Sequence, residues 1–478
     1  MDKQTNFDMV LFGATGDLAM RKLLPCLYQA HAAGLLHPEG RILGVSRSQF
    51  DRNAFLSKVE TDSKIHIKQN FDEHTWASFV QRLDYLTVDV THPEHFVDLA
   101  AKVNAREHTD NIVIYLSTAP KFFAPACQAL ADVGLNNDKV RIVLEKPLGT
   151  DLPTCQQINA DVAQFFKEEQ IYRIDHYLGK ESLQNLLPLR FGNVFFEQVW
   201  HKDFVQSVQI TIAEQLGVEE RGEFYDITGA LRDMVQNHII QMLCFTAMER
   251  PQSLSADDVR DEKMKVLQAL KVMSQAEVDA NVVRGQYTAT DSQAGYLQEP
   301  HVPVNSHTET YVAIRAEINN ERWQGVPFYL RTGKRMAAKT AEIVLNFKEP
   351  AHSLFGSTPN RIVISFQPKE TITVRVFMKQ AGNGMQLAPA DMTINLAEVS
   401  NHRRAEAYEL LLREVIDGRL NLFNRRDELE AAWAWVMPIM ENWANSTVPP
   451  HGYPASSWGP QAARDLLARD GNAWLEEY

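Results

Sequence analysis

A short stretch near residue 175 holds side chains suited to binding a phosphate. Asp175, His176, Tyr177 and Lys180 follow one another closely there. Two potential cations and a phenol suit a phosphate monoester, because hydrogen bonds to charged groups are worth about 1.5–3 kcal/mol each. An ordinary charged turn would contain the same residue types, so the stretch alone leaves both interpretations open.

A histidine in a predicted helix is the candidate general base. His238 would share one helical face with apolar residues, beside a polar stripe of Asp233, Asn237 and Gln241. A histidine on an apolar face is usually a core residue with satisfied hydrogen bonds. Burying several further polar groups without a purpose is costly, so the stripe favours a functional site. Histidine suits proton transfer because its unperturbed pKa of about 6.5 leaves much of it neutral near pH 7.

A glycine-containing turn after the first apolar run predicts a dinucleotide site. The sequence Gly-Ala-Thr-Gly-Asp-Leu-Ala at 13–19 separates a predicted strand from a predicted helix. Gly13 would permit the tight turn, Gly16 the approach of the backbone to a pyrophosphate, and Ala19 the packing of helix on strand. The pyrophosphate would lie at the helix N-terminus. The candidate contacts in this turn are Gly13, Ala14, Thr15, Gly16, Asp17 and Leu18.

The end of the second apolar run indicates which dinucleotide binds. NAD sites place an acid there to bind a ribose hydroxyl, whereas this chain has Gly-Val-Ser-Arg-Ser at 44–48. Arg47 could make a bidentate contact with a 2′-phosphate, and Ser46 or Ser48 could add a hydroxyl donor. The pattern favours NADP, and the alternative is a solvated surface arginine.

Lys146 is a further candidate because it directly follows an apolar run. It lies in Glu-Lys-Pro-Leu-Gly at 145–149. The C-terminal ends of strands in an open parallel sheet face the ligand crevice. Lys146 could therefore touch both nicotinamide and substrate, although a surface lysine explains the motif equally well.

The elements that must position these residues fall into two patterns. Through about residue 175, apolar runs alternate with helical stretches, which predicts right-handed crossovers and a doubly wound parallel sheet, hence an α/β, Rossmann-like domain. The expected strands are 7–12, 41–45, 83–90, 111–116, 139–144 and 170–174, and examples of the helices are 18–33, 93–104 and 152–166.

The rest of the chain predicts an α+β domain with a large, mainly antiparallel sheet and covering helices. Alternation over 208–212 indicates a strand with one covered face, and one helix is expected over 225–248. Further strands are expected at 310–316, 326–331, 342–347, 361–367, 371–378 and 391–396, and helices at 257–270, 404–416 and 428–443. The expected domains are 1–175 for the dinucleotide and 176–478 for substrate and oligomerisation.

Composition excludes several classes of function. A formal net charge of −13 over 478 residues disfavours nucleic acid and anionic membranes. No apolar run is long enough to span a membrane, and the N-terminus does not resemble a signal peptide. The four cysteines form no Cys-x-x-Cys pair and no metal-ligand spacing. We therefore expect buried, reduced thiols in a cytoplasmic protein without a metal site.

Five motifs together resemble the glucose-6-phosphate dehydrogenase family, in particular its bacterial members, over nearly the whole chain. The nine-residue motif at 173–181 is the most specific, whereas Glu-Lys-Pro is shared with other sugar oxidoreductases. The motifs lie at 13–19, 145–149, 173–181, 232–238 and 330–334.

The resemblance implies oxidation of glucose 6-phosphate to 6-phosphogluconolactone with hydride transfer to NADP, the first step of the oxidative pentose phosphate pathway. His238 matches the family's general base, and Asp175 matches the carboxylate that orients it. Such a reaction needs no metal, because the ring oxygen supports positive charge as hydride departs. One base typically contributes about 10²–10⁴-fold to the rate.

The resemblance also implies the ligand contacts. His176, Tyr177 and Lys180 match the phosphate binders. The sugar contacts match Lys146, Glu214, Asp233 and Lys334, with Lys339 and Gln367 as further matches, and the cofactor contacts match Arg47, Asp89, Val90 and Lys146.

Two other functions remain open at this point: another NADP-dependent sugar oxidoreductase, and a catalytically inactive NADP sensor. The presence of both Asp175 and His238 speaks against a sensor, which would need neither. The family resemblance further implies a homodimer or homotetramer.

Overall fold

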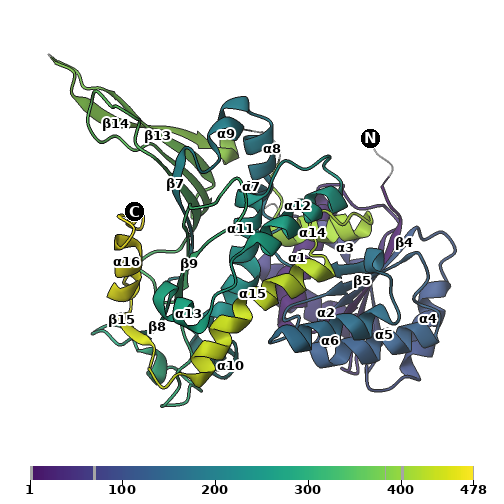
Figure 1. Cartoon of the computed structure of the whole chain (residues 1–478). Helices are drawn as coiled ribbons and strands as arrows, with labels where there is room; N and C mark the ends of the chain where they lie inside the picture. The colour runs from purple at the N-terminus through teal and green to yellow at the C-terminus, as the bar shows by residue number, and fades with distance from the viewer. Residues whose placement is uncertain (1–3, 68–70, 383, 400–402, 477–478) are drawn as a thin grey trace. The chain divides into compact units, whose positions relative to one another are not determined.

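The computed structural model describes residues 4–67, 71–382, 384–399 and 403–476, and it divides the chain into two compact units (Figure 1). The first unit comprises Met1–Glu181, Gln252–Arg260 and Ala405–Glu430. The second comprises Ser182–Pro251, Asp261–Arg404 and Ala431–Tyr478. Each unit is therefore assembled from segments that are far apart in the sequence.

The first unit is built on a six-stranded sheet in which every neighbouring pair is parallel, in the order β3-β2-β1-β4-β5-β6. The predicted doubly wound sheet is thus confirmed, and each predicted strand differs from the observed one by at most three residues at an end. The strands are β1 (Phe7–Phe12), β2 (Arg41–Ser46), β3 (Leu83–Thr87), β4 (Asn111–Leu116), β5 (Val140–Leu144) and β6 (Ile171–Arg173).

Helices cover both faces of this sheet, which explains the nearly unbroken apolar runs of its strands. Met9 and Leu11 pack into the cluster on one face, whereas Val10 and Phe12 pack into the cluster on the other. The first face is covered by α1 (Leu24–Ala32), α2 (Arg52–Ser63), α3 (Glu73–Val80) and α14 (Ala407–Ile416), and the second by α4 (His95–Asn104), α5 (Phe123–Asp132) and α6 (Leu152–Ala163).

The second unit contains a nine-stranded sheet in the order β14-β13-β12-β11-β7-β10-β9-β8-β15. The pairs β7–β10 and β8–β15 are parallel and the other neighbouring pairs are antiparallel, so the prediction of a large, mainly antiparallel sheet is confirmed. The strands are β7 (Val205–Ala213), β8 (Val282–Thr288), β9 (Tyr311–Ala316), β10 (Phe328–Gly333), β11 (Thr340–Phe347), β12 (Arg361–Gln367), β13 (Thr371–Lys379), β14 (Leu387–Asn395) and β15 (His451–Pro454).

The expectation that β7 has one solvated face is wrong. Gln209 and Thr211 are each only 2% exposed. The amide of Gln209 donates to the Ala473 carbonyl at 2.7 Å and accepts from the Leu475 backbone at 3.0 Å. The C-terminal segment therefore covers the polar face of β7, and it satisfies the buried amide groups that this covering creates.

The remaining helices of the chain include α10 (Gly222–Ala230), η6 (Leu231–Ile239), α11 (Ile240–Ala247), α13 (Gln275–Asn281) and α16 (Gln461–Ala468) in the second unit. Two helices, α12 (Ala256–Ala269) and α15 (Arg426–Asn445), contribute residues to both units. Within the described part of the chain, no helix is long and apolar enough to cross a membrane.

Candidate active site

The turn after β1 has the backbone that a dinucleotide site requires. Gly13 has a φ of +74°, and a Cβ placed on it would lie 2.3 Å from the carbonyl oxygen of Ser117. Only glycine fits this position without moving the chain that follows β4. A π-helical turn, η1 (Ala19–Leu23), then leads into α1. The turn thus presents bare backbone just before a helix, as pyrophosphate binding requires.

A pocket of about 290 Å³ opens beside this turn. Of the predicted cofactor contacts, those that line it are Gly13, Thr15, Gly16, Arg47, Asp89 and Val90, whereas Ala14, Asp17, Leu18 and Lys146 lie outside its lining. The glycine backbone and the Arg47 guanidinium at one pocket fit a dinucleotide that carries a 2′-phosphate. The pocket is also lined by four residues that were not predicted and that follow β4, the strand paired with β1: Ser117, Thr118, Ala119 and Phe122.

The pocket lining carries one acid as well as this cation. The backbone N–H and the hydroxyl of Thr91 donate to the Asp89 carboxylate at 2.9 and 2.8 Å, and these hydrogen bonds lower the pKa of Asp89. Because Asp89 is therefore ionised at neutral pH, a phosphate in this pocket would depend on Arg47 for its opposite charge.

The predicted phosphate-binding residues form one compact loop directly after β6. Asp175 is 1% exposed, and its Oδ1 accepts a hydrogen bond from the Tyr177 backbone at 2.9 Å. The Tyr177 ring lies edge-on to the His176 ring at 5.1 Å, and Lys180 Nζ lies 4.6 Å from the Tyr177 ring centre. The buried carboxylate thus fixes the turn that groups an imidazole, a phenol and an ammonium.

A buried carboxylate supports the segment that carries Lys146. Glu145 is 7% exposed, accepts a 2.5 Å hydrogen bond from the Tyr115 hydroxyl, and accepts a weaker one from the Lys146 backbone at 3.3 Å. Burial raises the pKa of Glu145.

The ring of Tyr408, on α14, stacks over His176 with centroids 6.2 Å apart. Tyr115 and Tyr408 were not predicted, because a single phenol in an apolar run or a helix carries no distinctive signal.

In the second unit, a lysine and two acids lie together. Lys334 Nζ is 2.5 Å from Glu214 Oε2 and 3.9 Å from Asp233 Oδ2. The lysine side chain is only 5% exposed, while Glu214 and Asp233 are 39% and 29% exposed. The Tyr225 ring lies 5.0 Å from Lys334 Nζ. Three predicted sugar contacts therefore form one partly open cluster of acceptors around a cation.

The parallel pairing of β7 and β10 explains this cluster. Glu214 and Lys334 each come directly after one of these strands, and Ala213 pairs with Gly333. The Glu214 backbone N–H donates to the Gly333 carbonyl at 2.9 Å, which holds the two ends together. Lys339 directly precedes β11 and Gln367 ends β12, with Ala341 paired to Gln367. Lys339 is exposed, and Gln367 is half-buried.

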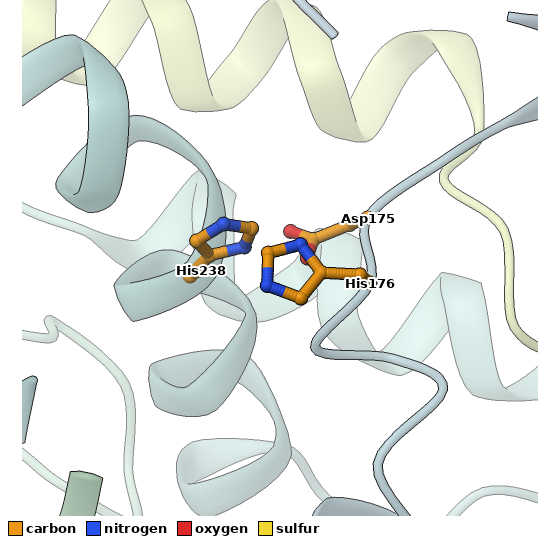
Figure 2. Close-up of side chains that lie close together, drawn as sticks. All are labelled: Asp175, His176 and His238. Carbon is orange, nitrogen blue, oxygen red and sulfur yellow. The ribbon is translucent and has the colours of Figure 1, made fainter. Parts of the chain in front are cut away.

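His238 lies on η6 and is 1% exposed. Figure 2 shows its side chain together with Asp175 and His176, which come from the segment after β6. The helix predicted over 225–248 is present as three consecutive helical segments over 222–247. They are not one α-helix, because Gly229 has non-helical φ and ψ of 68° and 169° and residues 231–239 form a π-helix. The wider π-helical turn changes which residues share a face, so the predicted apolar face and polar stripe do not hold as drawn for an α-helix.

Two domain models of one family together match nearly the whole chain. The model described as glucose-6-phosphate dehydrogenase, NAD binding domain, matches residues 10–185. The model described as glucose-6-phosphate dehydrogenase, C-terminal domain, matches residues 187–475.

Curated relatives and solved structures agree with these models. The chain is 43% identical to the glucose-6-phosphate 1-dehydrogenase of Dickeya dadantii and 44% identical to that of Mycolicibacterium smegmatis, with at least 97% of each chain covered. A solved glucose-6-phosphate dehydrogenase in complex with its substrate glucose-6-phosphate is 32% identical, with a TM-score of 0.92 and 99% of both chains covered. The enzyme from Mycobacterium avium is 33% identical, with a TM-score of 0.86 and the same coverage. The chain therefore belongs to the glucose-6-phosphate dehydrogenase family.

Proposed function

We propose that this chain oxidises glucose 6-phosphate to 6-phosphogluconolactone and transfers the hydride to NADP. The observation that carries the proposal is the full-length similarity to a solved enzyme that holds glucose 6-phosphate. In support, the first unit contains a dinucleotide-type pocket and a cationic loop, residues 175–180. The second unit contains the cluster of Lys334 with Glu214 and Asp233.

The proposed cofactor site is the pocket beside Gly13. The backbone of the 13–16 turn would hold the pyrophosphate, and Arg47 would hold the 2′-phosphate. Because NAD lacks the 2′-phosphate, the Arg47 contact would favour NADP over NAD. Asp89 and Val90 line the same pocket. When bound, NADP supplies the acceptor for the hydride.

His238 is the proposed general base, which takes the proton of the anomeric hydroxyl at an imidazole nitrogen. Asp175 is proposed to hold that imidazole in the correct orientation and to stabilise its protonated form, as a buried carboxylate can. Its near-complete burial supports this role, because a buried carboxylate is shielded from competing water.

The remaining predicted residues are proposed to hold the sugar phosphate. His176, Tyr177 and Lys180 would bind the phosphoryl group through charge-assisted hydrogen bonds. The acids would accept hydrogen bonds from sugar hydroxyls, and the lysines would donate them. The proposed sugar contacts are Lys146, Glu214, Asp233, Lys334, Lys339 and Gln367.

One assay tests the activity and the base together. Purified protein with NADP and glucose 6-phosphate should produce NADPH, detected by absorbance, and His238→Asn should lower kcat about 10²–10⁴-fold while leaving KM nearly unchanged. Asn keeps a similar volume but cannot act as a base. A kcat like that of the wild type in this variant would refute the base assignment.

The same assay distinguishes the alternatives. Turnover of an unphosphorylated sugar at least as efficient as that of glucose 6-phosphate would favour another sugar oxidoreductase. NADP binding without turnover over a wide pH range would favour a sensor.

We also propose that the protein forms a homodimer or homotetramer through β13 and β14. These strands lie at the end of the sheet opposite β15 (Figure 1). Met378, Met392 and Ile394 are 60%, 56% and 49% exposed on them, which is unfavourable for a surface without a partner. Light scattering should report at least two subunits, and the double variant Met392→Glu, Ile394→Lys should dissociate the assembly. A wild-type protein that is monomeric at high concentration would exclude the proposal.

A cytoplasmic location is proposed on the state of the thiols. Cys26, Cys127, Cys155 and Cys244 are all buried. Buried cysteines without Cys-x-x-Cys or disulfide-type spacing are typical of proteins in a reducing compartment.

A further inference from the structure

The phenol of Tyr85 makes hydrogen bonds with the turn at 46–48 that carries Arg47. The hydroxyl of Tyr85 lies 2.7 Å from Ser46 Oγ and 2.7 Å from the Ser48 carbonyl oxygen. Tyr85 therefore contacts the residue on each side of Arg47. The contacts with Ser46 and Ser48 join the outgoing end of β2 to the neighbouring strand β3.

The chemistry of the groups shows which one donates in each of these hydrogen bonds. A carbonyl only accepts, so the single hydroxyl proton of Tyr85 goes to the Ser48 oxygen. Ser46 Oγ then donates to the Tyr85 oxygen and accepts from the Ser48 backbone N–H at 3.2 Å and from the Thr15 hydroxyl at 3.2 Å. The Ser46 carbonyl, at 3.4 Å, is a second and weaker acceptor for the Tyr85 hydroxyl. These hydrogen bonds connect the Arg47 turn to the turn after β1.

Packing keeps the Tyr85 hydroxyl at this place. Tyr85 is 5% exposed, and its ring stacks on Phe55 with centroids 4.8 Å apart and an interplanar angle of 28°. Its Cα pairs with Gly44 of β2. Burial raises the pKa of Tyr85, so the phenol keeps its proton at neutral pH. Tyr85 is thus closely packed beside the Arg47 turn and remains a hydrogen-bond donor.

We propose that Tyr85 is a positioning residue that sets the preference for NADP over NAD by fixing the turn that carries Arg47. The inference rests on the proposed function of Arg47. A long guanidinium side chain binds a phosphate well only when little of its freedom, and that of its backbone, remains to be lost on binding. Tyr85 does not line the pocket itself, so its effect passes through the turn.

The test measures dissociation constants for NADPH and NADH by calorimetry, without sugar. Tyr85→Phe keeps the ring and removes only the hydroxyl. We expect it to weaken NADPH about 3- to 10-fold, as the loss of one neutral hydrogen bond does, and to leave NADH nearly unchanged. Tyr28→Phe is the matched control, because Tyr28 is a buried phenol of the same apolar cluster that bonds Asp72, away from Arg47.

A double-mutant cycle with Arg47→Ala isolates the mechanism. Tyr85→Phe should have no further effect on NADPH once Arg47 is removed. Equal weakening of NADPH and NADH by Tyr85→Phe, or an effect that persists in the Arg47→Ala background, would overturn the inference. If Arg47→Ala alone leaves NADPH binding unchanged, the proposed selector role of Arg47 fails instead.

A second variant covers the case in which Tyr85→Phe does not fold. Thr87 Oγ1 donates to the same Ser48 carbonyl at 3.1 Å and is half-buried. Thr87→Val should shift the ratio of the two dissociation constants in the same direction by a smaller factor. An unchanged ratio in this variant would count against the inference.

Discussion

The cationic loop after β6 concentrates its chemistry in a few side chains held by one carboxylate. Asp175 accepts a hydrogen bond from the backbone of Tyr177, and the Tyr177 ring contacts both His176 and Lys180. The adjacent Arg173 has a different role, because it is 1% exposed and pairs with Glu168 at 2.6 Å. Of the basic residues in the motif, His176 and Lys180 are half-buried, which is compatible with their proposed role in binding phosphate.

Lys180 provides a test at this scale. Lys180→Ala should raise KM for glucose 6-phosphate about 10- to 100-fold, because a charge-assisted contact to the phosphate is lost, with little effect on oxidation of free glucose. Steady-state kinetics with both sugars measures this. Lys167→Ala is the control, since Lys167 is an exposed lysine of the same unit paired with Asp138. Equal changes for both sugars would remove the phosphate assignment.

Charged side chains at the ends of strands were predictable from the sequence, whereas the buried residues that contact and position them were not. Arg47 and Lys146 come just after apolar runs, so position and residue type together indicated them, whereas Glu214 was indicated only by the family resemblance. Tyr85 and Tyr408 looked like ordinary core residues. Their roles come from what their hydroxyl groups and rings reach in space, and sequence spacing does not contain that information.

At the scale of elements, the entry to η6 is a junction that requires glycine. Gly229 has a φ of 68°, and a Cβ on it would lie 2.4 Å from Glu309 Oε1. The same carboxylate accepts from the Leu231 backbone at 3.0 Å, at the start of the helix that carries Asp233 and His238. The buried acid therefore satisfies a backbone donor that a helix start leaves unpaired.

Gly229→Ala should consequently cost stability and activity together. We expect a loss of about 1–3 kcal/mol from the backbone conformation alone, and a further loss because Glu309 must move. Gly325→Ala is the control, because Gly325 also has positive φ but nothing lies within 4 Å of its Cβ position. Thermal unfolding and kcat measure the two effects. If both variants behave alike, the contact with Glu309 is unimportant.

Most elements could be predicted from periodicity, and the failures have physical causes. The strands of the first unit were predictable because burial on both faces leaves continuous apolar runs. Strand β8 was missed because its interior contains Arg284, Gly285 and Gln286. The alternation in β7 was seen correctly but misinterpreted, since the C-terminal segment covers its polar face. Such long-range partners are not encoded in local patterns.

For the molecule as a whole, the first unit depends on a helix from late in the chain. Leu411, Leu412 and Val415 of α14 pack into the same cluster as Met9 and Leu11 of β1. Leu411→Ala should destabilise this unit by about 2–5 kcal/mol, because a buried cavity replaces the side chain. Val97→Ala, at a 61% exposed position on α4, should change stability by at most about 0.5 kcal/mol.

Urea unfolding measures the change in the free energy of unfolding. Hydrogen exchange of the native protein at the amides of β1 and β4 then shows whether the first unit is the part that loses stability. Faster exchange in these strands is expected for Leu411→Ala only. Unchanged exchange there would mean that the first unit does not need α14 for its stability.

This dependence has a consequence for how the protein is made. A ribosome finishes β6 at Arg173 but reaches α14 only at Ala407, which at about 5–20 residues per second takes roughly 10–50 s. During that interval the sheet surface that includes Met9 and Leu11 lacks one of its covering helices. The nascent chain thus exposes an apolar surface for tens of seconds, so its yield in a cell should depend on chaperones that shield this surface until α14 has been synthesised.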